Sequence, residues 1–361
     1  MLRVLLVTHG ELSIKKMGYI VRVNNLIHCL KQRDDVYLKI IEYPNLMVAE
    51  GKQVPQEDTI RLNAPRNWFV FGPKLIFDSI LKMPFIKKFD IIVIEGSVFF
   101  PYAFIGRILG KKVVYDSHAF ISMISRKTAG ISNFIKRRII GESLDWLAVK
   151  TSHYTITVSN YDLEYAKNYF KIKPNKIFTI PNSVEIKACH PVNNVGKYWL
   201  FVGDMTFEPN YLAVLEIFKI AERLRNERFV IVGRGNERFL HHPSNVDFTG
   251  MVDSLDELYM NAKGCLIPLF IGAGIKTKVI ECMSYGKRVL TTRVGVEGLE
   301  NLHEVEGHGL TVKDDIDGLI EEVSHDDKTN IYLELIQYVK KYYSLCVMCK
   351  KLDEFIDVVK Q

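Results

Sequence analysis

Residues 268–286 read Pro268-Leu-Phe-Ile-Gly-Ala-Gly-Ile-Lys-Thr-Lys-Val-Ile-Glu-Cys-Met-Ser-Tyr-Gly286, and this stretch decides the fold class. A strand-like apolar run ends at Pro268, a Gly-Ala-Gly loop occupies 272–274, and a helical pattern begins beyond it. A strand that leads through a glycine-rich loop into a helix is typical of a doubly wound parallel sheet, which binds ligands beyond the carboxyl ends of its strands. The stretch therefore predicts an α/β protein with a ligand site at this loop.

The start of the predicted helix carries two lysines and a glutamate. Lys276 and Lys278 fall in its first turn, and Glu281 lies three residues beyond Lys278. Lysines in a first turn oppose the helix dipole, and a bound pyrophosphate would offset this because free N–H groups and the dipole attract phosphate there. Glu281 can accept two hydrogen bonds from the cis-diol of a ribose. The alternative, a surface helix with ordinary Lys–Glu pairs, leaves the Gly-Ala-Gly loop unexplained.

Short apolar runs alternate with helix-length segments in both directions from this stretch. Near-continuous apolar strands of this kind indicate parallel sheets that are covered on both faces. A turn-forming patch at 191–196 separates two series of runs, and each series predicts one Rossmann-like domain. We expect strands at 3–8, 36–42, 90–95, 112–116, 154–159 and 177–181, and then at 198–203, 228–233, 246–248, 264–269, 288–292 and 309–312.

The predicted organisation is two doubly wound domains that face one central cleft. The first domain is expected at 1–192 and the second at 193–335. Helical periodicity from 331 to 360 predicts a C-terminal helix, counted as 336–361, that crosses back to the first domain.

The composition is that of an ordinary globular protein, with 48% apolar and 25% charged residues in 361, which excludes disordered and collagen-like chains. No apolar run reaches the ~20 residues of a spanning helix, and the N-terminus lacks the apolar region of a signal peptide. We therefore expect a cytoplasmic protein. Six cysteines are too few for a disulfide framework. Cys346 and Cys349 are expected to lie as small apolar residues on one face of the C-terminal helix.

The charge is unevenly divided. Residues 1–192 hold 28 Lys and Arg against 16 Asp and Glu, a net +12, whereas residues 193–361 carry a net −6. This indicates that the first domain meets an anionic surface or acceptor. The alternative is a solvated face that happens to be basic.

Four further residues follow predicted strands and so fall at the expected ligand edge. Gly18 opens the helix after the first strand, and His118 follows the strand at 112–116, where it can donate a hydrogen bond to a substrate. Gly203 and Arg234 follow the first two strands of the second domain and suit an anion. Each also has a structural interpretation, as a turn glycine, a core histidine or a surface arginine.

Taken together, these segments resemble the retaining glycosyltransferases of the GT-B fold, in particular family 4, also called glycosyl transferases group 1. The resemblance covers nearly the whole chain and is most specific over 198–300. The matching segments, in family order, are Thr157-Val158-Ser159, Ile180-Pro181-Asn182-Ser183-Val184, Phe201-Val202-Gly203, Ile231-Val232-Gly233-Arg234-Gly235, Glu281-Cys282-Met283-Ser284-Tyr285-Gly286 and Arg288-Val289.

The resemblance implies roles for individual residues. Glu281 matches the second glutamate of the family's E-x7-E motif, which holds the nucleotide ribose, and His118 matches the histidine that contacts the donor sugar. The first glutamate of the motif would fall at Ala273, so the sugar hydroxyls need other partners. The implied donor-binding set is Gly18, Gly203, Arg234, Gly272, Ala273, Gly274, Ile275, Lys276, Lys278 and Glu281, with His118, Lys278 and Glu281 as the catalytic residues.

The implied reaction moves a hexosyl group from a nucleoside diphosphate to an acceptor hydroxyl, with retention of anomeric configuration and no cofactor. Lys278, helped by Lys276 or Arg234, would stabilise the charge that develops on the leaving pyrophosphate. We see no D-x-D motif suited to ligate a metal, since Asp253 and Asp256 are spaced too widely, so we expect metal-independent transfer.

The acceptor is expected to be a glycan, lipid-linked, in the synthesis of cell-surface polysaccharide or glycoconjugate. Basic clusters in the first domain, with aromatic residues between them, suit a peripheral position on the inner face of a membrane. These are Lys87-Lys88, Lys111-Lys112, Lys136-Arg137-Arg138, Trp68, Phe69, Phe71, Phe99 and Phe100. More than half of the aromatic residues among them are expected to belong to the core. The alternatives are a nucleic-acid or other soluble acceptor, which we expect less, and a non-catalytic subunit that binds sugar nucleotides.

Overall fold

The computed structural model describes residues 1–10, 12, 18–44, 58–63, 68–123, 131–187, 196–325 and 331–360, without the side chains of 68–70 and 131–138. The chain forms two compact units. Unit 1 comprises Met1–Asn182 and Met348–Gln361, and unit 2 comprises Ser183–Val347. The predicted domain boundary at 192/193 lies outside the described residues, so it stays a prediction.

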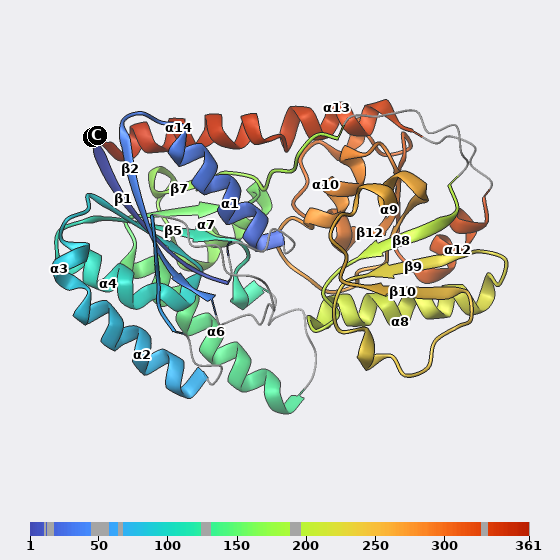
Figure 1. Cartoon of the computed structure of the whole chain (residues 1–361), viewed down its shortest axis with the longest axis horizontal. Coiled ribbons are helices and arrows are strands. Elements are labelled where there is room, and N and C mark those ends of the chain that lie inside the picture. The colour runs from blue at the N-terminus through green and yellow to red at the C-terminus, as the bar shows by residue number, and fades with distance from the viewer. Residues whose placement is uncertain are drawn as a thin grey trace. The chain divides into compact units, whose positions relative to one another are not determined.

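Unit 1 is built on a parallel seven-stranded sheet with the strand order β3-β2-β1-β4-β5-β6-β7 (Figure 1). The order reverses between β1 and β4, which makes their carboxyl ends the switch point of the sheet. The apolar run 4–7 in β1 is completely buried, as expected for a strand covered on both faces. The strands are β1 (Leu2–His9), β2 (Val36–Tyr43), β3 (Thr59–Arg61), β4 (Ile91–Glu95), β5 (Lys112–Ser117), β6 (Tyr154–Thr157) and β7 (Ile177–Thr179).

Helices cover both faces of this sheet. Figure 1 shows α2, α4 and α6 on one face, with α1 and α14 on the other. The helices are α1 (Gly18–Lys31), α2 (Trp68–Leu81), α3 (Met83–Ile86), α4 (Phe100–Ile108), α6 (Ile131–Thr151), α7 (Asn160–Phe170) and α14 (Leu345–Lys360), with 3-10 turns at Ser97–Phe99 and Pro174–Lys176.

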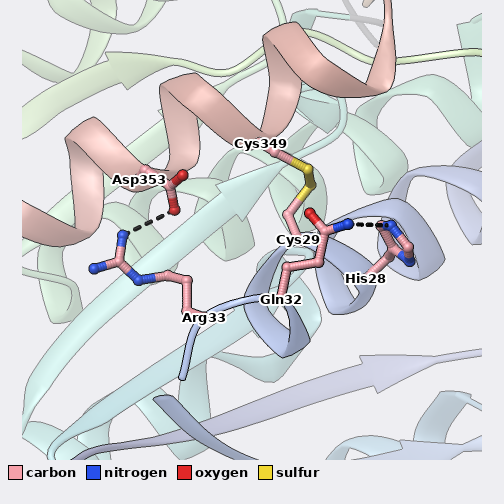
Figure 2. Close-up of a disulfide and its surroundings, with 6 residues drawn as sticks. All are labelled: His28, Cys29, Gln32, Arg33, Cys349 and Asp353. Carbon is pink, nitrogen blue, oxygen red and sulfur yellow. Dashed lines mark hydrogen bonds and ion pairs between the residues drawn. A yellow bond between two sulfur atoms is a disulfide. The ribbon is translucent and has the colours of Figure 1, made fainter. Parts of the chain in front are cut away.

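The C-terminal part of α14 is tied to α1. Cys349 forms a disulfide with Cys29 of α1, and Arg33 Nη1 donates a 2.8 Å hydrogen bond to Asp353 (Figure 2). Lys360 also pairs with Asp35. The expectation that Cys349 packs as a free apolar residue is therefore wrong, because its disulfide partner lies far away in the sequence. Cys346 is also not an apolar packing residue, since it is exposed.

Unit 2 contains a parallel six-stranded sheet with the order β10-β9-β8-β11-β12-β13. Its strands are β8 (Tyr198–Val202), β9 (Phe229–Val232), β10 (Val246–Gly250), β11 (Ala262–Ile267), β12 (Arg288–Thr292) and β13 (Leu310–Lys313). Its helices are α8 (Glu208–Arg223), α9 (Asp256–Asn261), α10 (Thr277–Ser284), α11 (Arg293–Val296), α12 (Ile316–Ser324) and α13 (Leu333–Tyr342), with 3-10 turns at Asn236–Arg238 and Leu302–Glu304.

The doubly wound α/β architecture is confirmed, and every predicted strand is present. The sequence reading missed β3, a three-residue strand at the edge of the first sheet that pairs in register with β2. The single helix predicted over 331–360 is two helices. The break occurs at 343–344 because the backbone there pairs with Val184: the Val184 N–H donates to the Tyr343 carbonyl at 2.9 Å, and Ser344 forms a bridge with Val184.

Candidate functional site

In unit 2, the loop between β11 and α10 has the conformation that its glycines permit. Gly272 and Gly274 adopt φ values of +156° and +67°, which disfavour residues with a Cβ. Ile275 is buried and anchors the loop. Lys276 is the N-cap residue of α10, so only Lys278 lies in the first turn, and the Lys276 amine lies 3.5 Å from Glu297 Oε2.

Lys278 is partly buried, and its side chain reaches the first turn of α8, the helix that follows β8. Its Nζ donates a 2.6 Å hydrogen bond to Asn210 Oδ1 and lies 4.1 Å from the centre of the Phe201 ring. The loss of solvation in this position lowers the pKa of the Lys278 amine to about 7. The amine therefore exchanges a proton near neutral pH and gains its full charge when an anion binds beside it.

Gly203 provides the space that Lys278 occupies. A Cβ at position 203 would lie 3.0 Å from the Lys278 Nζ and 3.1 Å from the Asn210 side chain. A Cβ on Gly233, at the end of β9, would in turn overlap the Gly203 carbonyl oxygen at 1.8 Å. The turns after β8 and β9 are thus packed backbone to backbone next to the lysine.

Arg234 is connected to the same place through Asp204. Its guanidinium donates two hydrogen bonds to Asp204 Oδ2, at 3.0 and 2.7 Å, and the Asn210 amide donates to the Asp204 carbonyl oxygen at 2.9 Å. A chain of contacts therefore runs from Lys278 through Asn210 and Asp204 to Arg234. Because Asp204 already balances the charge of Arg234, Lys278 is the better placed cation for an anionic ligand.

Glu281 lies one turn beyond Lys278 on α10. Its Oε2 accepts a 3.1 Å hydrogen bond from the Tyr259 hydroxyl, and the Tyr259 ring stacks on Tyr285 with centroids 4.5 Å apart. Burial raises the pKa of the Glu281 carboxyl above its usual value. Tyr285 is held in turn by a 2.5 Å hydrogen bond to Asp256, so the glutamate is fixed from one side.

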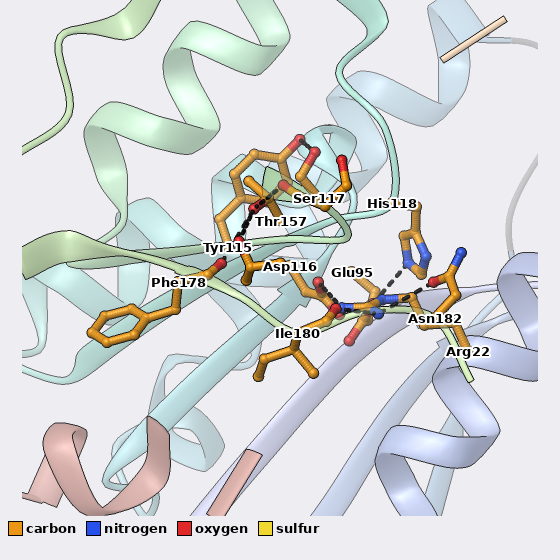
Figure 3. A network of polar contacts seen from close by, with 12 residues as sticks. Arg22, Glu95, Tyr115, Asp116, Ser117, His118, Thr157, Phe178, Ile180 and Asn182 are labelled. Carbon is orange, nitrogen blue, oxygen red and sulfur yellow. Dashed lines mark hydrogen bonds and ion pairs between the residues drawn. The ribbon is translucent and has the colours of Figure 1, made fainter. Parts of the chain in front are cut away.

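In unit 1, the ends of β4 and β5 bring together a polar cluster around His118 (Figure 3). His118 directly follows β5, and its Nε2 lies 2.8 Å from Oε2 of Glu95, the last residue of β4. Glu95 is fully buried, whereas the His118 side chain is 18% exposed. Desolvation lowers the pKa of His118 to about 4, so its imidazole is neutral at physiological pH and can donate a hydrogen bond from one nitrogen.

A buried ion pair between Arg22 and Asp116 adjoins this cluster. Arg22 of α1 donates to both carboxylate oxygens of Asp116, at 3.1 and 2.7 Å. Its remaining Nη1 donates to the Ile180 carbonyl and to Asn182 Oδ1. Both members of the pair are essentially without solvent contact, and these bonds fix α1 against the ends of β5 and β7.

His9 occupies the end of β1 in the same cluster. Its ring stacks on Tyr19 with centroids 4.7 Å apart, and Tyr19 meets His118 edge-on at 6.2 Å. Desolvation, with the neighbouring His118 as a second cause, lowers the pKa of His9 to about 4. Gly18, the first residue of α1, is exposed.

The structure thus brings Gly203, Arg234, Lys278 and Glu281 together within unit 2, and places His118 and Gly18 in unit 1. Sequence reasoning missed Asn210, which fixes Lys278, and Glu95, which contacts His118. The signal for Glu95 was a lone carboxyl at the end of an otherwise apolar strand. The signal for Arg22 and Asp116 was weaker, since each is a single charge in an amphipathic helix or at a strand end.

Within the described ranges, His, Cys, Asp and Glu side chains do not gather in groups of three or more that could hold a metal ion. No described helix is both long enough and apolar enough to cross a membrane.

Two family comparisons match the chain. Residues 21–188 match Glycosyltransferase Family 4, and residues 196–325 match Glycosyl transferases group 1. Together the two matches span most of both units. No curated protein matches the chain by sequence.

Solved structures share the fold over the whole chain. Sucrose-phosphate synthase from Thermosynechococcus elongatus is 13% identical with a TM-score of 0.79, and the match covers 99% of each chain. Anabaena HepE in complex with UDP-glucose is 12% identical with a TM-score of 0.71, covering 99% of this chain and 100% of that one. WaaG, a glycosyltransferase involved in lipopolysaccharide biosynthesis, is 12% identical with a TM-score of 0.70, covering 98% and 99%. This structural similarity shows a shared GT-B fold.

Proposed function

The chain belongs to the group 1, family 4 glycosyltransferases, and from this premise we propose that it moves a hexosyl group from a nucleoside diphosphate to a hydroxyl of a lipid-linked glycan, with retention of configuration. The observation that carries the proposal is the Lys278 amine, which is held by Asn210 at the start of α10 with a pKa of about 7. An amine in this state is suited to an anion whose charge increases during the reaction.

The leaving pyrophosphate is such an anion. As the glycosidic bond breaks, negative charge accumulates on the phosphate oxygens, and a cation fixed beside them lowers the energy of the transition state more than that of the bound donor. The free N–H groups at the start of α10 act in the same direction. With Lys278 and these groups in place, we propose that transfer needs no divalent metal.

The remaining donor contacts are assigned by chemistry. The Glu281 carboxyl accepts hydrogen bonds from the ribose diol, while the Tyr259 hydroxyl holds it in place. Ala273 has no polar side chain to bind the sugar, so the backbone N–H groups of Gly274 and Ile275 are proposed to take that part. His118 is proposed to donate to a hydroxyl of the donor sugar.

The lipid-linked acceptor is supported by an exposed apolar surface on unit 1. Neighbouring helices α2, α4 and α6 expose large apolar side chains, each at least 44% accessible, and we call this set the apolar helix face: Ile76, Phe77, Ile80, Leu81, Phe104, Ile108, Ile139, Ile140 and Trp146. The exposed Arg107 adjoins Ile108, and the exposed Lys87 and Lys88 follow α3. Apolar side chains beside basic residues suit the surface of an anionic bilayer. We therefore propose a peripheral position on the cytoplasmic face of a membrane.

The aromatic residues first considered for this role are different ones. Phe71 and Phe99 are completely buried, so they are among the aromatic residues that belong to the core and do not face a membrane. Phe100 is partly buried. The side chains of Trp68, Phe69 and Lys136-Arg137-Arg138 lie outside the described residues.

The function is tested by the release of nucleoside diphosphate from UDP-, GDP- and ADP-sugars, with and without a membrane lipid extract. Turnover that depends on the lipid supports a lipid-linked acceptor. Turnover that depends instead on a soluble glycan or on nucleic acid overturns that acceptor but keeps the enzyme. Tight nucleotide binding without turnover on any acceptor indicates a non-catalytic subunit.

Membrane association has its own test, by sedimentation with anionic and neutral vesicles at low and high salt. We expect salt-sensitive binding to anionic vesicles, weakened in a Phe77→Ser, Phe104→Ser double variant. Leu240→Ser, which changes a side chain of unit 2 that is 85% exposed, serves as the matched control. Equal binding to both vesicle types, or equal effects of the two changes, contradicts the proposed surface.

A further inference from the structure

We propose that Glu95 is a positioning residue for His118: its buried carboxyl fixes the imidazole through Nε2 and leaves the Nδ1 proton to be donated to substrate. This inference rests on the proposed function for its consequence in catalysis, but the hydrogen-bonding arrangement can be measured without any donor. It starts from the close approach of the two side chains at the ends of β4 and β5 (Figure 3).

On its Nε2 side, the His118 ring has the Glu95 carboxyl as its neighbour. Glu95 Oε2 lies 2.8 Å from Nε2, which is hydrogen-bond distance, although the two groups are not yet aligned for a linear bond. Such contacts are often poorly aligned without substrate and tighten when it binds. On the other side of the ring, the buried Nδ1 has no hydrogen-bond partner among the described residues.

A buried nitrogen without a partner costs free energy, because it has lost its hydrogen bonds to water without replacement. Native proteins rarely accept this cost in a purely structural position. His9, at the adjacent strand end, also keeps a buried Nδ1 without a partner in the described part of the chain. Two such nitrogens at the switch point of one sheet indicate a site that a ligand completes.

Electrostatics decide which partner carries the proton between His118 and Glu95. Glu95 pairs in register with Asp116 across β4 and β5, and Asp116 engages Arg22 through both carboxylate oxygens. The charge of Arg22, the cation beside Glu95, is therefore already balanced by Asp116. Burial first, and the Asp116 charge second, raise the pKa of Glu95 well above its usual value; Arg22 lowers it by less, and a side-chain interaction with Asp116 raises it further.

Glu95 therefore keeps its proton to a higher pH than a free carboxyl, while the His118 imidazole is neutral at physiological pH. A protonated Glu95 carboxyl donates to Nε2, which must then be the unprotonated nitrogen of the imidazole. The hydrogen bond at one ring nitrogen determines which nitrogen carries the proton, so the proton sits on Nδ1 and that nitrogen is a donor. The titratable groups that face the pair are Asp116, Arg22, His9 and Tyr19, and the low pKa of His9 keeps a second positive charge away from it.

The arrangement can be read directly from the ring nitrogens of His118 by 15N NMR of protein labelled at histidine. We expect the wild type and Glu95→Gln to show the Nδ1–H tautomer at neutral pH, because the glutamine amide also donates to Nε2. Glu95→Leu, which fills the space without a donor, should shift the ring toward the Nε2–H tautomer. Asp145→Asn is the matched control, since Asp145 is an equally buried acid of unit 1 that accepts from the Ser122 N–H instead.

Activity gives the second measurement. Glu95→Leu should lower kcat by roughly 10–100-fold with little change in the donor KM, the range seen when the partner of a functional histidine is removed. Glu95→Gln should stay within a few-fold of the wild type and should lack the loss of activity at alkaline pH that ionisation of Glu95 causes in the wild type.

A Glu95→Leu protein with the wild-type tautomer overturns the proposal, as does one with a lowered Tm but unchanged kcat per folded molecule. If that variant does not fold, the tautomer in Glu95→Gln decides, because an Nε2–H ring there, or in the wild type, is equally contrary. If no nucleotide sugar is turned over by the wild type, the proposed function fails while the tautomer result still stands on its own.

Discussion

The Nζ of Lys278 donates a hydrogen bond of 2.6 Å to Oδ1 of Asn210, a residue 68 positions earlier in the chain. This contact joins the first turn of α10 to the first turn of α8. The Lys278 amine therefore lies between the N-termini of these two helices. The Asn210 amide donates in turn to the Asp204 carbonyl oxygen, which fixes its orientation. The position of the amine is therefore set before any ligand arrives.

Proton uptake on nucleotide binding follows from this position. The pKa of Lys278 is lowered to about 7, so at pH 8 most of the amine is neutral, and a bound pyrophosphate raises that pKa again. We expect the binding of a nucleoside diphosphate at pH 8 to take up close to one proton, measured by calorimetry in buffers of different ionisation enthalpy. Lys278→Met should abolish the uptake. Lys219→Met, an exposed lysine paired with Glu216, should leave it unchanged, and equal uptake in both variants would exclude Lys278.

The same shift predicts a pH dependence of stability. Because the folded pKa of Lys278 lies below that of the unfolded chain, the unfolded state binds more protons between about pH 7 and 10.5. The loss of folding stability caused by the desolvated Lys278 amine is thus absent above this window. It grows as the pH falls through the window, by at most about 1.4 kcal/mol per pH unit. Lys278→Met should remove this contribution to the pH dependence of Tm, and a curve identical to the wild type would show that the amine is not desolvated.

Glu281→Gln should weaken nucleotide binding. Two charge-assisted hydrogen bonds to the ribose become weaker neutral ones, and the expected loss is on the order of 1.5–3 kcal/mol. Because burial raises the pKa of Glu281, the affinity of the wild type should also fall on acidification. Calorimetry with the nucleoside diphosphate tests both effects. Glu257→Gln on the neighbouring helix α9 is the control, and equal affinities for all three proteins would remove Glu281 from the site.

Transfer should survive the removal of divalent metals. Lys278 and the N–H groups of α10 are proposed to offset the pyrophosphate charge, so an excess of EDTA should leave kcat within about twofold. Activity that is abolished by the chelator and restored by magnesium or manganese would refute this.

The disulfide should stabilise unit 1. Cys29–Cys349 closes a loop of 320 residues, and its loss through Cys349→Ser should lower the free energy of unfolding by about 2–4 kcal/mol. Denaturant unfolding measures the loss, and a reducing agent should reproduce it in the wild type. Cys346→Ser, at an exposed thiol three residues away, is the matched control. Equal denaturation midpoints for both variants would mean that the disulfide contributes nothing.

A structural feature of this protein could be predicted from the sequence where the residues that determine it lie close together in the chain. The strands and the loop at 272–274 were predictable, because apolar periodicity and glycine positions act over a few residues. The short β3 was not, since three residues at a sheet edge carry too little pattern. Glu281 and Lys278 were identified from their helix, but Asn210 and Glu95 were not, because their roles depend on partners far away in the chain. The Cys29–Cys349 disulfide was not predicted, for the same reason.

If His118 acts on the donor sugar, one preparation of His118→Ala should reveal it through Tm, nucleoside diphosphate affinity and kcat measured together. Loss of one preorganised donor should weaken transition-state stabilisation by about 2.7–4 kcal/mol, which lowers kcat roughly 100- to 1000-fold. Nucleotide affinity should stay nearly intact, since the contact is made with the sugar. His153→Ala is the control, because the His153 Nδ1 only accepts from the Val113 N–H at the start of β5; it should lower Tm and keep kcat. A His118→Ala protein that behaves like this control, destabilised but with near-normal kcat, would contradict the account.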